Sequence, residues 1–224
     1  IPAYNEEHRI RQLFDRISRS DGELIVVCDG NDRTADVVKS VAGSRPDLII
    51  RCLHFHERLG KGGGVIAGLK AARAPIVGFF DADGSTSVEE MERLFSHLGR
   101  YDGAIGSRWV GGSVVTIRQG LLRQLESRGF NLIIRILFGL EYHDTQCGAK
   151  VFTRRAIESV LPALHSTGFE FDVELLWRLK KAGFVIGEFP IAWQNTGDSR
   201  VRGTDMIRML IGLLNVRLLH KGAP

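Results

Sequence analysis

The chain has 224 residues, enough for one α/β domain with a hydrophobic core and short for two. Its 44% hydrophobic and 25% charged residues are typical of a globular protein, and no apolar run of about 18 residues predicts a transmembrane helix. The net charge of +4 by itself fits nucleic acid, anionic lipid or a phosphorylated substrate. No basic stretch is interleaved with aromatic residues, which argues against nucleic acid as a partner, and three cysteines without metal-ligand spacing predict reduced thiols.

Strand-length apolar segments alternate with segments of helical period in the first half. Ile10, Leu13, Phe14 and Ile17 follow the spacing of a buried helix face, with Asn5 as the expected N-cap. Further strands are expected at 24–27, 48–53, 75–80 and 104–106, and further helices at 63–74 and 88–98. This alternation predicts an α/β fold with a mostly parallel sheet flanked by helices.

The second half is less regular. Helices are expected at 119–138, 172–182 and 207–219, and strands at 150–153 and 184–193. We expect a single domain over 1–224, with a nucleotide-binding half (1–107), an acceptor and catalytic half (108–198) and an amphipathic tail (199–224). The chain begins at Ile1 rather than Met, and we expect residues of a first strand to precede it.

Acidic residues follow two of the predicted strands. Asp29 ends the strand at 24–27, and Asp81-Ala82-Asp83 ends the strand at 75–80. Ligands of open α/β sheets bind at the carboxyl ends of the strands. Two close carboxylates repel unless a cation shares them, so the Asp-x-Asp pair predicts Mg²⁺ or Mn²⁺ that a diphosphate also binds. The alternative is a solvated turn.

A glycine-rich run lies between these strand ends. Residues 58–64 read Arg-Leu-Gly-Lys-Gly-Gly-Gly and precede a predicted helix. Glycine amides, the ammonium of Lys61 and a helix N-terminus together suit a phosphate.

These segments together resemble the family 2 glycosyltransferases. The matching segments are 1–7, 26–34, 60–62, 81–84 and 106–108. Residues 144–152 and 169–176 are similar to the polyprenyl-phosphate branch, which includes dolichyl-phosphate β-glucosyltransferase and dolichol-phosphate mannose synthase. The resemblance runs from Ile1 to about Trp193 and implies a nucleotide-diphospho-sugar transferase (GT-A) fold.

The resemblance also implies site residues. The donor nucleotide would contact Pro2, Ala3, Tyr4, Glu6, Asp29, Lys61, Asp81 and Ala82. The metal would be bound by Asp81 and Asp83. The catalytic residues would be Asp172, a candidate base, with Asp144 and Arg108. The sugar or acceptor would contact Gln146, Ser107, Arg200 and Arg202.

Two departures concern the donor. Cys28 stands where the family often has Asp, so we expect the nucleotide pocket to differ in detail. Ser85 stands where mannose synthases tend to have a metal-binding Gln. The second departure favours UDP-glucose over GDP-mannose.

The implied reaction is the inverting, metal-dependent transfer of a hexose from a nucleotide diphosphate sugar to a polyprenyl or dolichyl phosphate. A phosphomonoester has its second pKa near ~6, so it needs cationic positioning more than a base. One alternative is a family 2 enzyme that uses GDP-mannose or another donor with a soluble or polysaccharide acceptor. The other is a non-catalytic nucleotide-sugar-binding protein.

Two segments combine apolar stripes with arginines and lysines. The stripes consist of Leu121, Leu122, Leu125, Leu132, Ile133, Ile136 and Leu137, and of Met206, Ile207, Leu210, Leu213 and Leu214. Such helices either pack on the sheet or lie on an anionic membrane surface. With the resemblance, the second reading predicts a peripheral protein at the cytoplasmic face of a membrane.

Overall fold

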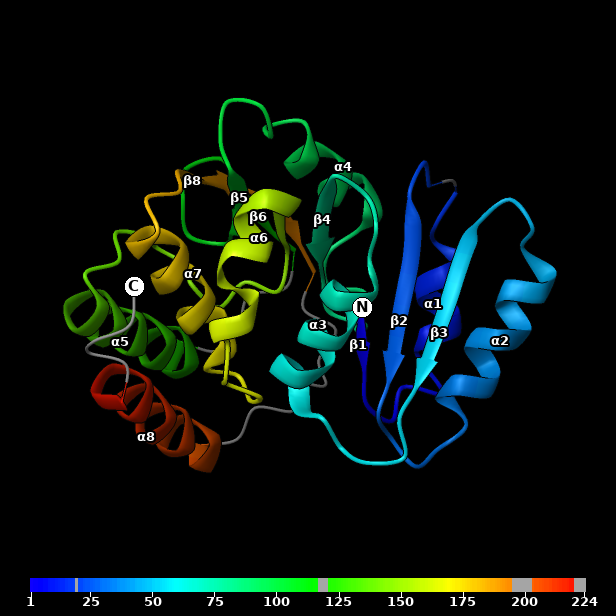
Figure 1. Ribbon diagram of the computed structural model, residues 1–224, viewed down its shortest axis with the longest axis horizontal. Helices are drawn as coiled ribbons and strands as arrows, with labels where there is room; N and C mark the ends of the chain where they lie inside the picture. The colour runs from blue at the N-terminus through cyan, green and yellow to red at the C-terminus, as the bar shows by residue number, and fades with distance from the viewer. Residues whose placement is uncertain (19, 117–120, 195–202, 220–224) are drawn as a thin grey trace.

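The computed structural model describes residues 1–18, 20–116, 121–194 and 203–219 (Figure 1). A first sheet of parallel strands has the order β1-β2-β3, formed by Pro2–Ala3, Glu23–Cys28 and Ile49–His54. A second has the order β4-β7-β5-β8, formed by Ile76–Phe79, Lys150–Thr153, Gly103–Ser107 and Ile186–Pro190. A short pair joins β6 (Val114–Val115) to β9 (Ala192–Trp193).

Helices connect and cover these strands. In the first half they are α1 (Ile10–Asp15), α2 (Thr34–Ser44), α3 (Gly60–Ala71) and α4 (Val88–Phe95). In the second half they are α5 (Leu121–Phe138), α6 (Arg154–Val160) with a 3-10 turn at Leu161–Ala163, α7 (Phe171–Lys181) and α8 (Gly203–Leu219). The predicted α/β fold is confirmed, although α2 and α6 were not predicted.

Strand β7 reverses the direction of the second sheet. It lies antiparallel between β4 and β5, so that Lys150 pairs with Phe79 and with Ile105. Apolar pattern predicts that 150–153 is a strand, but it does not predict the strand's partners or direction. The reversal brings Lys150 next to Phe79 at the end of β4, two residues before Asp81.

Two local expectations were wrong. The residue before α1 is Arg9, not Asn5; Asn5 adopts a left-handed φ of 51°, and its side-chain oxygen accepts a hydrogen bond from the amide of Asn31 at 3.0 Å. The strand expected at 184–193 is divided at Ile191, whose amide donates to Ser107. Beyond this point β9 pairs with β6 instead of β5.

The sides of β7 face two hydrophobic clusters. Val151 belongs to the cluster under β2, α1, α2 and α4, whereas Phe152 belongs to the cluster among α3, α5, α6, α7 and α8. Side chains alternate along a strand, so Lys150 shares the side of Phe152. The chain thereby directs a lysine into the apolar interior toward α7.

Candidate functional site

Asp29 caps the first turn of α3. Its Oδ2 accepts hydrogen bonds from the amides of Leu59 and Gly60, at 2.8 and 3.0 Å, and Asp29 is 6% exposed. Arg58 precedes this turn, and its guanidinium lies 4.2 Å from the centre of the Tyr4 ring. These contacts join the predicted nucleotide-binding segment to α3.

The glycines of α3 allow a close approach of the segment before α7. A side chain at Gly62 would place its Cβ 2.5 Å from the carbonyl oxygen of Ser166 and 2.6 Å from the Cβ of Phe171. The amides of Gly62 and Gly63 donate to the carbonyl of Thr167, at 2.8 and 3.3 Å. Each of these two amides therefore already has a protein acceptor in this structure, and phosphate binding by this turn stays a prediction.

Lys61 lies between two carboxylates. Its Nζ is 3.2 Å from Oδ1 of Asp81 and 3.2 Å from Oδ2 of Asp172, and its side chain is 13% exposed. Burial by itself would lower the pKa of Lys61, but the charges of Asp172 and Asp81 outweigh burial and raise it. Lys61 is therefore a permanent cation.

Asp172 lies on the first turn of α7 and is 1% exposed. Its second oxygen is 2.6 Å from Nζ of Lys150, which also donates to the carbonyl of Cys147. Burial would raise the pKa of Asp172, but Lys150 and Lys61 hold this pKa below its usual range. A carboxylate with a depressed pKa is a poor proton acceptor near neutral pH, so this geometry favours a charge-holding role over general-base catalysis.

Arg108 and Asp144 form a second ion pair. The guanidinium donates to both oxygens of Asp144, at 2.7 and 2.9 Å, and the amide of Arg108 donates at 3.0 Å. Burial opposes both charges, yet their mutual attraction raises the pKa of Arg108 and lowers that of Asp144. The guanidinium lies 5.4 Å from the centre of the Trp193 ring, and Asp81 is close enough to contribute to the raised pKa of Arg108.

The Asp-x-Asp pair forms a turn. Gly148 admits the carboxylate of Asp81, because a Cβ there would lie 2.0 Å from Oδ2, and Oδ1 of Asp83 accepts from the amide of Ser85 at 2.9 Å. No group of three or more His, Cys, Asp or Glu among the described residues could hold a metal ion. Two carboxylates fit Mg²⁺ or Mn²⁺ only where water or a diphosphate completes the ligand set. The metal-binding role of this pair stays a prediction.

The other residues predicted for the nucleotide are largely enclosed. Pro2 and Ala3 form β1 beside β2, and Ala3 and Ala82 are 0% and 4% exposed. The carboxylate of Glu6 accepts two hydrogen bonds from Arg9, at 2.8 and 3.0 Å. Pro2 and Tyr4, in contrast, are half-buried.

The residues predicted to contact the sugar or acceptor differ in their exposure. Ser107 is 0% exposed, and its hydroxyl accepts from the amide of Trp109 at 3.3 Å. In this structure Ser107 therefore has no surface with which to contact a sugar. Gln146 is half-buried. Arg200 and Arg202 lie outside the described residues.

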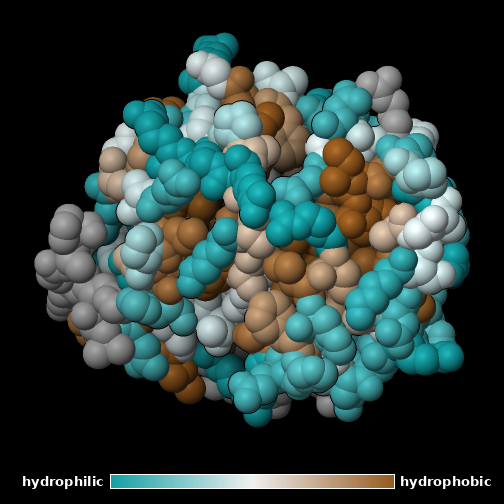
Figure 2. Space-filling model, turned by 45° about the vertical axis from the view of Figure 1, so that its right-hand side comes forward, coloured by the Kyte–Doolittle hydropathy of each residue, from teal (hydrophilic) through white to brown (hydrophobic). Residues whose placement is uncertain are grey.

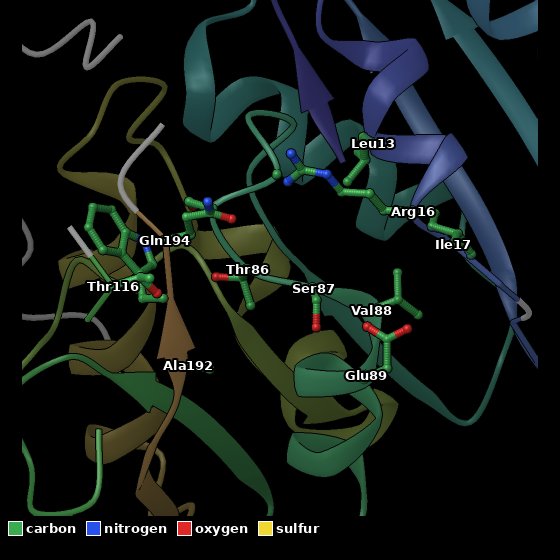
Figure 3. A pocket seen from close by; sticks show the side chains of 13 residues that line it. Leu13, Arg16, Ile17, Thr86, Ser87, Val88, Glu89, Thr116, Ala192 and Gln194 are labelled. Carbon is green, nitrogen blue, oxygen red and sulfur yellow. The ribbon is translucent and has the colours of Figure 1, made fainter. Parts of the chain in front are cut away.

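A pocket of about 290 Å³ borders the turn that follows Asp83. Figure 3 shows Arg16 extending from α1 over this pocket, with Thr86 and Ser87 opposite. The pocket shares no residue with the described part of the predicted site. Sequence reasoning missed it, although the hydroxyl run at 85–87 was a possible signal.

The sequence analysis also missed Lys150 and Gly148. Both lie within residues 144–152, which were identified as a motif without a role for either one. Their partners, Asp172 and Asp81, are separate from them in the sequence, and only the antiparallel pairing of β7 brings each pair together.

This fold, with paired acidic and basic residues at its strand ends, is that of a nucleotide-diphospho-sugar transferase. It is similar to glucosyl-3-phosphoglycerate synthase from Mycobacterium tuberculosis in complex with Mn²⁺ and UDP-glucose, with a TM-score of 0.70 and 22% identity over 96% of this chain and 76% of that one. A model of the family described as Glycosyl transferase family 2 matches residues 1–161. The chain belongs to this family and is a glycosyltransferase.

Of three curated relatives, the second and third indicate the branch by their names. Glycosyltransferase AglD of Haloferax volcanii is 33% identical over 95% of this chain, which spans only 35% of that relative's length. Dolichyl-phosphate β-glucosyltransferase of Dictyostelium discoideum is 31% identical over 98% of this chain and 73% of its own length. Polyprenol monophosphomannose synthase of Mycolicibacterium smegmatis is 32% identical over 92% and 81%. These similarities confirm the polyprenyl-phosphate hexosyltransferase branch.

Proposed function

We propose that this chain transfers glucose from UDP-glucose to a polyprenyl or dolichyl phosphate, with inversion at the anomeric carbon and with Mg²⁺ or Mn²⁺. The observation that carries the proposal is the similarity to dolichyl-phosphate β-glucosyltransferases, which covers 98% of this chain in the Dictyostelium relative. The similarity therefore includes the second half, where we expect the acceptor to bind.

The cations of the site suit a diphosphate leaving group. Lys61 and Arg108 are both held as cations, and the carboxylates of Asp81 and Asp144 position them. Fixed charges in a partly buried site stabilise the negative charge that develops on the leaving group. A divalent ion at Asp83 would add Lewis-acid stabilisation of the same charge.

The nucleophile decides whether a base is needed. A phosphate acceptor is already ionised near neutral pH and attacks without losing a proton. Asp172 is held between Lys61 and Lys150, which suits a reaction that needs no carboxylate base. Direct attack opposite the leaving diphosphate would invert the anomeric configuration.

The choice of donor and metal has separate support. The crystallised glucosyl-3-phosphoglycerate synthase of the same fold was solved with Mn²⁺ and UDP-glucose. In this chain, Asp81 and Asp83 supply carboxylate oxygens, the ligands that Mg²⁺ and Mn²⁺ prefer. These observations favour UDP-glucose as the first donor to test.

A membrane surface would be bound by α5 and α8, which lie side by side (Figure 1). Nε of Arg217 on α8 donates to the carbonyl of Leu137 on α5 at 3.2 Å. Of ten exposed large hydrophobic residues among the described side chains, six are on these helices: Leu132, Ile133, Ile136, Ile211, Leu214 and Leu218, which are 40–75% exposed. We call these six residues the α5–α8 apolar surface.

Some residues of the two predicted apolar stripes pack into the core, and others are exposed. Leu213 is fully buried and Leu210 partly buried against the core, so these residues pack inward, whereas Leu214 is 40% exposed. Exposed Arg208 lies on α8, and exposed Lys180 and Lys181 end the neighbouring α7. On the face shown in Figure 2, hydrophobic areas are separated by hydrophilic residues.

Apolar residues bordered by cations suit the interface of an anionic membrane. None of the helices in the described part of the chain is both long and apolar enough to cross a bilayer. We propose peripheral binding at the cytoplasmic face of a membrane through the α5–α8 apolar surface.

The enzymatic proposal is tested by transfer from radiolabelled UDP-glucose to dolichyl phosphate in detergent. The same assay is run with GDP-mannose as donor, with 3-phosphoglycerate as a soluble acceptor, and with a chelator. Metal-dependent labelling of the lipid from UDP-glucose supports the proposal. Labelling of 3-phosphoglycerate alone identifies a soluble acceptor, and absence of transfer with any pair would contradict the proposal.

The membrane proposal is tested by co-sedimentation with anionic vesicles at low and high salt. We expect Ile136→Glu, at a residue that is 75% exposed on α5, to abolish binding. The matched control is Ile49→Glu, at a residue that is 63% exposed on β3. Equal losses in both variants, or no binding of the wild type at low salt, would refute the proposed surface.

A further inference from the structure

Four alternating charges connect the interior to the donor site. They are Lys150, Asp172, Lys61 and Asp81, joined by contacts of 2.6, 3.2 and 3.2 Å. The exposure of these side chains rises along the series, from 0% and 1% to 13% and 34%. Two positive and two negative charges balance, which limits the free-energy cost of burying them.

Lys150 is the innermost member and cannot touch a substrate from its position. It is 0% exposed, its backbone pairs with β4 and β5, and its ammonium lies 5.6 Å from the centre of the Phe79 ring. Its ammonium donates to Asp172 and to the carbonyl of Cys147. Lys150 can therefore affect the reaction only indirectly, through Asp172 or through the segment that carries Cys147.

The two oxygens of Asp172 have separate cations. Oδ1 contacts Lys150, and Oδ2 contacts Lys61. If Lys150 were absent, Lys61 would be the only cation among the described residues in contact with the buried carboxylate of Asp172. Ionic attraction is strong in a medium of low dielectric constant, so Lys61 would move inward and away from Asp81.

We propose that Lys150 is a positioning residue for donor binding. By neutralising one oxygen of Asp172, it limits the attraction of this carboxylate for Lys61, so that Lys61 stays beside Asp81 and available to a nucleoside diphosphate. This inference rests on the proposed function, because Lys61 is assigned to the phosphates of the donor there.

The experiment measures UDP-glucose affinity in the presence of Mn²⁺ by calorimetry for the wild type, Lys150→Met and the double variant Lys150→Met/Asp172→Asn. We expect Lys150→Met to weaken binding about tenfold or more, within the range of coupling between contacting residues. The double variant has no carboxylate to attract Lys61 inward, so it should recover most of the lost affinity.

The matched control is Arg178→Met, which breaks another buried ion pair on α7. Arg178 contacts Glu174 at 2.8 Å and has no described contact with Lys61. We expect it to lower the unfolding temperature, as Lys150→Met does, while leaving donor affinity unchanged. A purely structural role for Lys150 predicts the same pattern in both single variants and no recovery in the double variant.

The outcomes separate the two proposals. If the wild type binds UDP-glucose and Lys150→Met binds it equally well, the positioning role is refuted and the proposed function stands. If the double variant binds no better than Lys150→Met, the positioning role is also refuted. If Lys150→Met does not fold, the double variant decides alone: near-wild-type affinity supports the inference and lost affinity overturns it. A wild type that binds no nucleotide sugar overturns both proposals.

Discussion

Gly62→Ala tests whether close packing, rather than phosphate binding, explains the glycines of α3. The new Cβ would lie 2.5 Å from the carbonyl oxygen of Ser166 and 2.6 Å from the Cβ of Phe171. Neither contact can be relieved by rotating a side chain, because one atom is backbone and the other is attached to it. The matched control on the same helix is Gly68→Ala, whose Cβ would meet only Val27, at 3.4 Å.

The expected magnitude follows from two opposing terms. Replacing Gly by Ala inside a helix favours folding by about 1 kcal/mol, and this gain applies to both variants. Overpacking a close contact costs about 1–3 kcal/mol, and this cost applies only to Gly62→Ala. We therefore expect Gly62→Ala to be about 1–3 kcal/mol less stable than Gly68→Ala, or about 2–12 °C lower in Tm for a chain of this size.

Thermal unfolding followed by circular dichroism measures this difference, and UDP-glucose binding measures its effect on the site. Lys61 precedes Gly62, so displacement of this turn moves Lys61 relative to Asp81 and Asp172 and weakens donor binding. Gly68→Ala should bind as the wild type does. The reasoning is refuted if Gly62→Ala unfolds at or above the temperature of Gly68→Ala.

Three further predictions concern titration, thiol reactivity and metal. Arg108 holds the pKa of Asp144 below its unfolded value of about 3.9, so their pair stabilises the protein above about pH 4 and loses this contribution as the pH falls further. Urea unfolding at several pH values should therefore show a steeper acid loss in the wild type than in Asp144→Asn, and equal slopes would count against the pairing. The hydrogen bond between the thiols of Cys28 and Cys52 lowers the pKa of half-buried Cys52 to about 7, so iodoacetamide near neutral pH should label Cys52 before Cys28. Mass spectrometry that gives the reverse order would be inconsistent with this. Asp83→Asn should abolish any Mn²⁺-dependent thermal shift with UDP-glucose, and an unchanged shift would remove Asp83 from the metal site.

The sequence by itself determined the family and the order of most elements, α2 and α6 excepted. Hydrophobic period and turn residues report local backbone preference and burial, so most strands and helices were predicted close to their observed positions. The acidic strand ends predicted that Asp81 and Lys61 belong to one site, and the structure places them 3.2 Å apart. This succeeded because strand ends of an α/β sheet meet at one edge whatever the details of packing.

The tertiary structure alone decided which residues of the site contact one another. The local pattern of 150–153 specifies a strand, but its antiparallel place between β4 and β5 depends on the remaining sheet, and this place directs Lys150 to Asp172. Likewise, glycines that suit phosphate instead admit the backbone before α7, and Ser107 is enclosed. The physical reason is that the local sequence restricts the dihedral angles of a residue. The packing of distant segments determines which atoms contact its charged group or its amide, and which atoms occupy the space that a glycine leaves.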